Sequence, residues 1–303
     1  MARRRKLEHH RRSLDEIREI MNSMKTLAYM ETRKLARFLD AQQAVVKSIE
    51  DAAADLLSFY PEILPTEQAS TPVYLLFGTE RGFCGDFNHE LLRHLESDLQ
   101  QRNIHHPVLI AVGRKLYSLL EHDQRLAAAI DGASVVEEVT SLIHTLVTTL
   151  TDIQQQYGSL SVSAFYHSSE EIIEMQPLLP PFRHLQQQPP AYAQPPLLNL
   201  TPQQFLVELT DHYLFAALHE MLYTSLMVEN HHRLAHLEGA VKHLDDELEE
   251  LRRQSNMLRQ EEIVEEIEVI LLSASSLDES QVRRKTGMPH EILTQDAPTD
   301  SAQ

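Results

Sequence analysis

The pattern of hydrophobic positions predicts a long amphipathic helix near each end of the chain. Residues 14–59 contain neither glycine nor proline, and apolar residues recur there in pairs that repeat every seven residues. The pairs are Leu14/Ile17, Met21/Met24, Ala28/Glu31, Leu35/Phe38, Gln42/Val45, Ile49/Ala52 and Leu56/Phe59. Only Glu31 and Gln42 interrupt this pattern, which is typical of a coiled-coil seam. We expect the helix to end before Pro61 and its seam to include Leu14, Ile17, Met21 and Leu35.

A second long helix is predicted to start after Pro202 and to end at about Leu277. Its seam residues follow one another in steps of three and four: Leu234, Leu237, Val241, Leu244, Leu248 and Leu251. Beyond Leu258 the pattern slips, which indicates a change of partner or a local rewinding of the supercoil. A helix of this length cannot be buried in one small domain, so we expect the first helix to pack against it in the antiparallel direction.

The middle of the chain has a different pattern. Short apolar runs at residues 73–77, 107–113, 160–168 and 171–179 predict strands, and two of them precede helical patterns at residues 87–101 and 114–121. Strands that alternate with helices indicate a mostly parallel sheet, here in a small Rossmann-like domain. The fold class is therefore α/β, with a long antiparallel coiled coil. The expected parts are residues 1–60 (coiled-coil helix), 72–183 (α/β domain), 184–202 (Pro/Gln-rich loop), 203–277 (coiled-coil helix) and 278–303 (disordered tail).

Charge narrows the possible partners. The net charge of −18 argues against a general nucleic-acid binder, and no apolar run approaches the roughly 20 residues that cross a bilayer, so no direct membrane span is expected. Arg3, Arg4, Arg5 and Lys6 open the chain, whereas acidic residues crowd residues 245–268. If Met24 faces Arg233, the basic end lies opposite residues 250–254 and clamps them. The alternative is that both runs are simply solvated.

The stretch "GTERGFCG" (residues 78–85) lies between a predicted strand and a predicted helix, as phosphate-binding loops do. The spacing of Gly82 and Gly85 does not fit the dinucleotide fingerprint, and no GK[ST] follows. Cys84, the single cysteine, could be a nucleophile if His89 or His94 served as base, but a structural cysteine is the alternative. His232 and His236 have a metal-ligand spacing without an obvious third ligand. We expect no catalytic residue, no cofactor and no metal site.

Three motifs carry a resemblance to a known family. "IMNSMKTLA" (residues 20–28) is similar to "ITxAMKMVA", "TERGFCGDFN" (79–88) to "SDRGLCGxxN", and "NMLRQEEIVEEIEVI" (256–270) to "NxxRQxxITxExxEI". Glu229 and Arg233 match the upstream "ExxxR" of the last motif. The chain thus resembles the γ subunit of F-type rotary ATP synthases over residues 14–277. It departs from the family pattern at Thr26, Val264 and Val269.

The resemblance implies a central-stalk rotor subunit that transmits torque between the membrane c-ring and the catalytic hexamer, coupling ATP synthesis or hydrolysis to proton or sodium-ion transport. It implies as partners the α and β subunits of the hexamer, the ε subunit and the c-ring. It also implies a peripheral location at the cytoplasmic face of a bacterial membrane. The implied hexamer contacts are Met24, Arg259, Gln260 and Glu266. The implied foot-domain loop, which binds no nucleotide, contains Arg81, Gly82, Cys84, Gly85 and Asn88.

Two other functions remain open on the residues alone. One is a Rossmann-type nucleotide-binding enzyme with helical arms, which nucleotide binding by the isolated chain would distinguish. The other is a coiled-coil scaffold protein without a rotary role. Neighbouring genes for the hexamer and ring subunits would separate that scaffold from a rotor subunit.

Overall fold

A computed structural model describes residues 2–64, 70–185 and 194–285. The chain divides into two compact units, Met1–Ile17 with Leu244–Gln303, and Arg18–His243. We call them the terminal unit and the main unit. Helices α1 (Ala2–Phe59) and α5 (Pro202–Lys285) contribute to both units. Each unit is described by itself below.

The main unit contains a five-stranded sheet of order β3-β2-β1-β4-β5. Strands β1 to β4 pair in parallel, and the edge strand β5 runs antiparallel to β4. The strands are β1 (Thr71–Phe77), β2 (Val108–Val112), β3 (Leu126–Ile130), β4 (Leu160–His167) and β5 (Ile173–Leu179). The sequence analysis did not predict β3, whose "LAAAI" lacks the β-branched and aromatic run that marks a strand.

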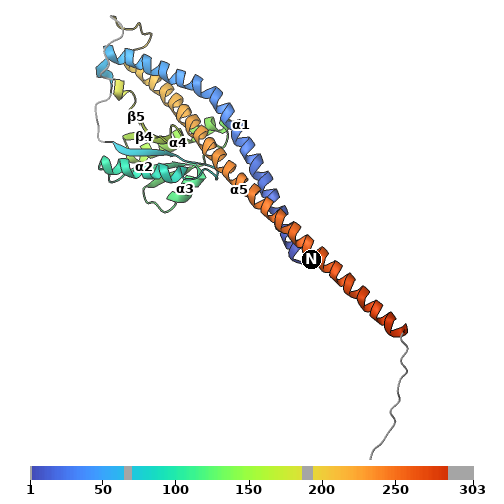
Figure 1. Ribbon diagram of the computed structural model, residues 1–303. Coiled ribbons are helices and arrows are strands. Elements are labelled where there is room, and N and C mark those ends of the chain that lie inside the picture. Colours follow the sequence, from blue (N-terminus) through green and yellow to red (C-terminus); the bar gives the residue numbers. More distant parts are fainter. Residues whose placement is uncertain (1, 65–69, 186–193, 286–303) are drawn as a thin grey trace, which may run out of the picture. The chain divides into compact units, whose positions relative to one another are not determined.

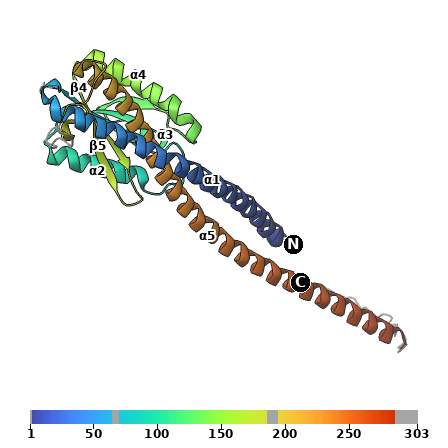
Figure 2. The same cartoon turned by 90° about the horizontal axis from the view of Figure 1, so that it is seen from above.

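Helices cover both faces of the sheet. One face packs against α2 (Phe87–Gln101) and α3 (Arg114–Leu120), and the other against α4 (Val139–Tyr157), α1 and α5. Figure 2 shows α2 and α4 on opposite sides of the strands. Three short 3-10 helices complete the secondary structure: Pro61–Ile63, Val136–Glu138 and Arg183–Leu185. Helix α4 was not predicted either, so the sheet is covered more fully than the sequence analysis indicated.

Within the main unit, α1 and α5 run side by side in opposite directions (Figure 1). The buried stripe of α1 differs from the predicted one in the second position of three pairs. Leu39, Val46 and Ala53 are buried, whereas the predicted Phe38 and Val45 are 50% and 47% exposed. One residue turns a helix by about 100°, and each of these sites offers two adjacent apolar residues, so the repeat could not distinguish them. The same rotation leaves Ile17 in the terminal unit 40% exposed.

The two polar residues that interrupt the predicted seam of α1 have specific partners. The Gln42 side-chain amide donates to the backbone carbonyl of Ala216 on α5, at 3.0 Å. Glu31 accepts the backbone N–H of Val136 at 3.4 Å and pairs with Lys34 at 2.9 Å. These contacts fix how α1 lies along α5 and along the segment that precedes α4, because polar seam residues select one register.

The other predicted seam residues differ in burial. On α1, Leu35 is buried, and Leu14 and Met21 are half-buried. On α5, the buried residues are Leu237, Val241 and Leu251, and the half-buried ones are Leu234, Leu244 and Leu248. Helix α5 begins at Pro202, one residue before the predicted start, and continues to Lys285, past the predicted end at Leu277. The remainder of the predicted tail, residues 286–303, lies outside the described residues.

In the terminal unit, the basic end of α1 lies beside the acidic stretch of α5. Arg4 Nε is 3.1 Å from Glu262 Oε2, and His10 Nε2 is 3.8 Å from Glu247 Oε1. Arg4 therefore pairs about two turns further along α5 than residues 250–254, the predicted segment. The contact of His10 with Glu247 fits the predicted register, whereas the contact of Arg4 with Glu262 lies beyond the predicted segment. The predicted juxtaposition of opposite charges therefore holds, and the correction concerns the partner of Arg4.

We predict that Arg4→Glu lowers the melting temperature of the helix pairing, because it places two carboxylates together. The pair is exposed to solvent, so its expected contribution to stability is small and is largest at low salt. Circular dichroism melts at low and high salt measure this effect. The charge swap Arg4→Glu with Glu262→Arg should restore the melting temperature. Arg12→Glu, at an exposed position of the same helix end, is the control. A swap no more stable than the single variant would contradict the pairing.

Candidate functional site: the junction of the sheet with helix α5

The sheet has one topological switch point, between β1 and β4. The crossover after β1 uses α2 on one face, whereas the crossover into β4 uses α4 on the opposite face. Doubly wound sheets bind their ligands in the crevice that this reversal opens at the carboxyl ends of the strands. In this chain, side chains of α5 occupy that position. Ser225 Oγ lies 3.5 Å from the carbonyl of Phe77, and Val228 packs against Cys84 and Phe87.

A buried ion pair on α5 holds the loop that follows β1. Glu229 and Arg233 are 4% and 5% exposed, and the Arg233 guanidinium donates to the Glu229 carboxylate. Arg233 Nε also donates to the carbonyl of Gly82, at 3.3 Å. The Glu229 carboxylate accepts the backbone N–H of Arg81; burial raises the pKa of Glu229, and Arg233 opposes that rise. The pair therefore clamps two consecutive residues of the loop to the helix, and we call it the Glu229–Arg233 clamp.

The sequence pattern alone did not predict this contact. Glu229 and Arg233 match a family motif, but Arg233 was expected to face α1. The signal was a Glu–Arg pair four residues apart on a helix, flanked by Val228 and Leu234. Such spacing predicts that the two side chains meet, but it does not say toward which neighbour the pair points.

Cys84 is a structural residue of the same loop. Its thiol is 5% exposed and donates weakly to the carbonyls of Arg81 and Gly82, at 3.7 and 3.5 Å. Burial and then the charge of Glu229 raise the pKa of Cys84 to about 12. A cysteine nucleophile acts as the thiolate, so this environment disfavours the nucleophile hypothesis. The proposed bases His89 and His94 are exposed on α2.

The rest of the loop is closed by local contacts. Asn88 accepts the backbone N–H of Thr79 at 3.0 Å and donates to the Thr79 hydroxyl at 2.9 Å. Gly85 has a φ of +59°, in the left-handed region that favours glycine. Of the predicted loop residues, Arg81, Gly82, Cys84 and Gly85 therefore lie in the turn itself, and Asn88 lies in the first turn of α2.

A carboxylate of the chain itself occupies the place where a phosphate would be expected. Glu80 Oε2 accepts the backbone N–H groups of Arg114 and Gly132, at 3.0 and 2.7 Å, and Arg114 Nε lies 2.6 Å from Glu80 Oε1. At Gly113, with a φ of +108°, an added Cβ would lie 2.7 Å from the carbonyl oxygen of Thr79. The strand ends are thus closed by backbone packing and an internal anion, which disfavours a nucleotide at this edge.

Aromatic and histidine rings fill the remaining space above β4. His167, which is fully buried, stacks on Phe87 with 3.7 Å between ring centroids, and its Nε2 donates to the Phe87 carbonyl at 3.1 Å. Burial lowers the pKa of His167 to about 4. His232 packs edge-on against Phe87, whereas His236 lies beside Phe83. The described residues contain no group of three metal-ligating side chains.

The residues matched to hexamer contacts lie elsewhere. Arg259, Gln260 and Glu266 are exposed on the part of α5 in the terminal unit, and Met24 is half-buried on α1 in the main unit. Around them α5 exposes an unusual number of large apolar side chains. They are Met257, Ile263, Val264, Ile267, Val269, Ile270, Leu271 and Leu272.

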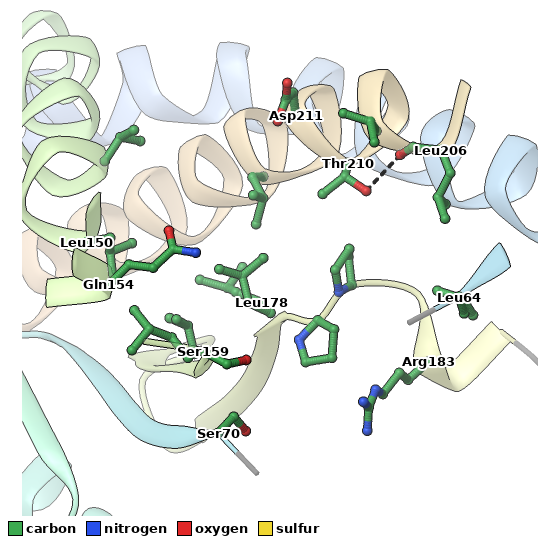
Figure 3. A pocket seen from close by; sticks show the side chains of 18 of the residues that line it. Leu64, Ser70, Leu150, Gln154, Ser159, Leu178, Arg183, Leu206, Thr210 and Asp211 are labelled. Atoms are coloured by element: carbon green, nitrogen blue, oxygen red, sulfur yellow. Dashed lines mark hydrogen bonds between the residues drawn. The ribbon is translucent and has the colours of Figure 1, made fainter. Parts of the chain in front are cut away.

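The main unit also holds an apolar cavity of about 710 Å³ (Figure 3). Helices α4 and α5 and the end of β5 line it, with Leu150, Leu178 and Leu206 among its apolar side chains. Thr210, at its edge, donates to the carbonyl of Leu206 at 2.8 Å. Nothing in this lining resembles a catalytic constellation.

Among residues 2–64, 70–185 and 194–285, no helix is both long and apolar enough to cross a lipid bilayer.

A doubly wound sheet whose ligand crevice is filled by a long helix of the same chain defines a structural subunit. Comparison with known proteins agrees. The family model described as ATP synthase matches residues 3–277. The ATP synthase gamma chain of Clostridium botulinum strain Langeland is 22% identical over 272 residues, covering 88% of this chain and 95% of that one. The ATP synthase gamma chain of Desulforamulus reducens is 23% identical over 291 residues, covering 92% and 100%.

Two solved structures share the fold. A chain of the Euglena gracilis mitochondrial ATP synthase has a TM-score of 0.57 at 14% identity, covering 97% of this chain and 99% of its own. A chain of the Tetrahymena thermophila enzyme, solved as central stalk and c-ring, has a TM-score of 0.52 at 16% identity, with 73% and 99% covered. The present chain belongs to the ATP synthase gamma chain family. It is thus a central-stalk, non-catalytic rotor subunit of an F-type ATP synthase. Enzymes of this class carry out rotary ATP synthesis and proton transport.

We predict that Arg233→Met destabilises the main unit by about 3–5 kcal/mol, because it leaves a buried carboxylate without its partner. Urea unfolding at neutral pH measures the loss. The double variant Glu229→Gln with Arg233→Met should recover a large part of it, because no charge is then buried. Arg93→Met, at an exposed arginine on α2, is the control. Equal losses in the single and double variants would contradict the role of the clamp.

We predict that the free energy of unfolding decreases as the pH falls from about 6.5 to about 4, in part because of His167. Its pKa is lower in the folded chain, so the unfolded chain binds the extra proton over this range. The expected share is at most about 3 kcal/mol. Urea unfolding of the wild type and of His167→Gln at several pH values tests this. His167→Gln should show a shallower pH slope, whereas the exposed-residue control His122→Gln should not.

Proposed function

We propose that this chain transmits torque between a membrane c-ring and a catalytic hexamer of α and β subunits, and so couples ATP synthesis or hydrolysis to ion transport. The observation that carries the proposal is the Glu229–Arg233 clamp. A domain that passes torque to a shaft must not turn on it, and a clamp buried at the centre of the junction resists such slippage better than an exposed contact would.

Helix packing supports the same proposal for the shaft. In the main unit, α1 and α5 are joined by a buried apolar stripe, and the hydrogen bond from Gln42 to Ala216 fixes their register. Two paired helices resist bending and sliding better than one, and polar contacts with defined partners oppose slippage by a turn. This pairing suits an element that must transmit rotation.

We further propose that Met24, Arg259, Gln260 and Glu266 contact the hexamer, and that the α/β domain forms the foot on the c-ring and the ε subunit. The exposed apolar side chains between Met257 and Leu272 support a protein partner around this part of α5. The similar solved chains come from assemblies that hold a c-ring, and one of these assemblies also holds F1 and OSCP. The corresponding location is peripheral, at the cytoplasmic face of a bacterial membrane.

We predict that replacing Arg259 and Gln260 together by alanine uncouples ATP hydrolysis from ion transport, because both are donor side chains suited to specific docking. The measurement compares ATPase rate with ion pumping in vesicles that carry the assembled complex. The subunit itself should fold normally, since both side chains are exposed. Arg252→Ala with Gln254→Ala, on exposed positions of the same helix, is the matched control. Unchanged coupling in the test variant would refute the proposed contact.

A further inference from the structure

A polar crevice of about 510 Å³ lies where the edge strand β5 meets α1 and α5 in the main unit. It is separate from the Glu229–Arg233 clamp and from the apolar cavity. Carboxylates reach it from three elements, and a single lysine accompanies them. The charged residues are Lys47, Glu50 and Asp51 from α1, Glu174 from β5 and Glu220 from α5.

Two buried tyrosines tie these carboxylates to the sheet. The Tyr166 hydroxyl on β4 lies 3.2 Å from Glu174 Oε2 and 3.2 Å from Gln176 Oε1. Tyr213 of α5, which is 1% exposed, hydrogen-bonds to Gln176 and to Glu50. Through these contacts β5 is attached to both long helices. The tyrosines stabilise the attachment in either protonation state of the nearby Glu220.

Glu220 is the member of this group whose charge is least well accommodated. It is half-buried, and Glu50 and Glu174 both act on it electrostatically. Burial raises the pKa of Glu220, and the charges of Glu50 and Glu174 raise it further. The other titratable groups around it are Lys47 and Asp51 of α1 and Tyr166 of β4, which line the crevice, and Tyr213 of its own helix. Among the described residues, Lys47 is the only basic side chain in the lining.

We propose that this crevice is a pH-sensitive latch, in which protonated Glu220 holds β5 against α1 and α5, and ionised Glu220 loosens that edge of the sheet. Protonation removes the negative charge of Glu220, so its repulsion with Glu50 and Glu174 falls, while the tyrosine hydrogen bonds remain. The latch therefore tightens as the pH falls. It would change how firmly the α/β domain is held at β5 without altering the Glu229–Arg233 clamp at the other end of the helix contact.

The sign of the effect follows from the raised pKa. Between the pKa of an unfolded glutamate, about 4.5, and the higher pKa of folded Glu220, the folded chain binds more protons than the unfolded chain. The free energy of unfolding therefore decreases as the pH rises through this interval. His167 acts in the opposite direction at the carboxyl end of β4, so a local readout is needed to separate the two.

Amide hydrogen exchange of the full chain, corrected for intrinsic rates, provides that readout. We expect exchange at β5 to become about threefold faster, or more, between about pH 4.5 and about pH 8 in the wild type, because this range begins at the pKa of an unfolded glutamate. Glu220→Gln should hold β5 at the slow rate at both pH values. Glu208→Gln, an exposed glutamate on the same helix, should behave as the wild type.

A second variant keeps the test decisive if Glu220→Gln folds poorly. Glu174→Gln removes one repelling charge and leaves Glu220 in place, so it should reduce the pH dependence at β5 without removing it. Exchange at the loop after β1 should be unaffected by either substitution. A pH dependence at β5 that is the same in Glu220→Gln, Glu174→Gln and the wild type would overturn the latch.

Discussion

The structure depends on one buried ion pair, Glu229 with Arg233, that joins the α/β domain to α5. A charge pair removed from water is costly unless its hydrogen bonds are satisfied. Here the guanidinium also donates a hydrogen bond to the carbonyl of Gly82, and the carboxylate also accepts one from the backbone N–H of Arg81. Satisfying the pair therefore requires the loop after β1 to lie in one place on the helix. This requirement fixes the position of the domain on α5 more specifically than apolar packing would, because apolar contacts have little directionality.

The same arrangement accounts for the loss of ligand chemistry from a nucleotide-binding type of sheet. The strand order still produces a switch-point crevice, but side chains of α5 fill it. The Glu80 carboxylate accepts the backbone N–H groups near α3 that could otherwise bind an anion. Cys84 and His167 are buried by the same contact, which favours a neutral thiol and a neutral imidazole. The residues that suggested a reactive site are thus parts of a mechanical joint.

The two units of the chain illustrate different uses of one helix pair. In the main unit the helices are covered by the sheet, and their polar seam residues have partners within the chain. In the terminal unit, the seam positions of α5 from Leu244 to Glu262 are buried or half-buried, and from Ile263 the described side chains are exposed. An apolar helix segment that the described residues leave exposed is suited to a partner. We propose that this partner is the hexamer.

The sequence by itself determined the two long helices, the alternation of strands and helices, and the motifs that indicate the family, because each is a local pattern. It could not decide between neighbouring apolar residues such as 38 and 39 or 45 and 46, since burying either one yields nearly the same free energy. Only the tertiary structure decided that α1 buries residues 39 and 46 and exposes residues 38 and 45. It also directed Arg233 toward Gly82 and placed Glu80 at the strand ends. These choices depend on contacts between residues far apart in the chain, which no local pattern records.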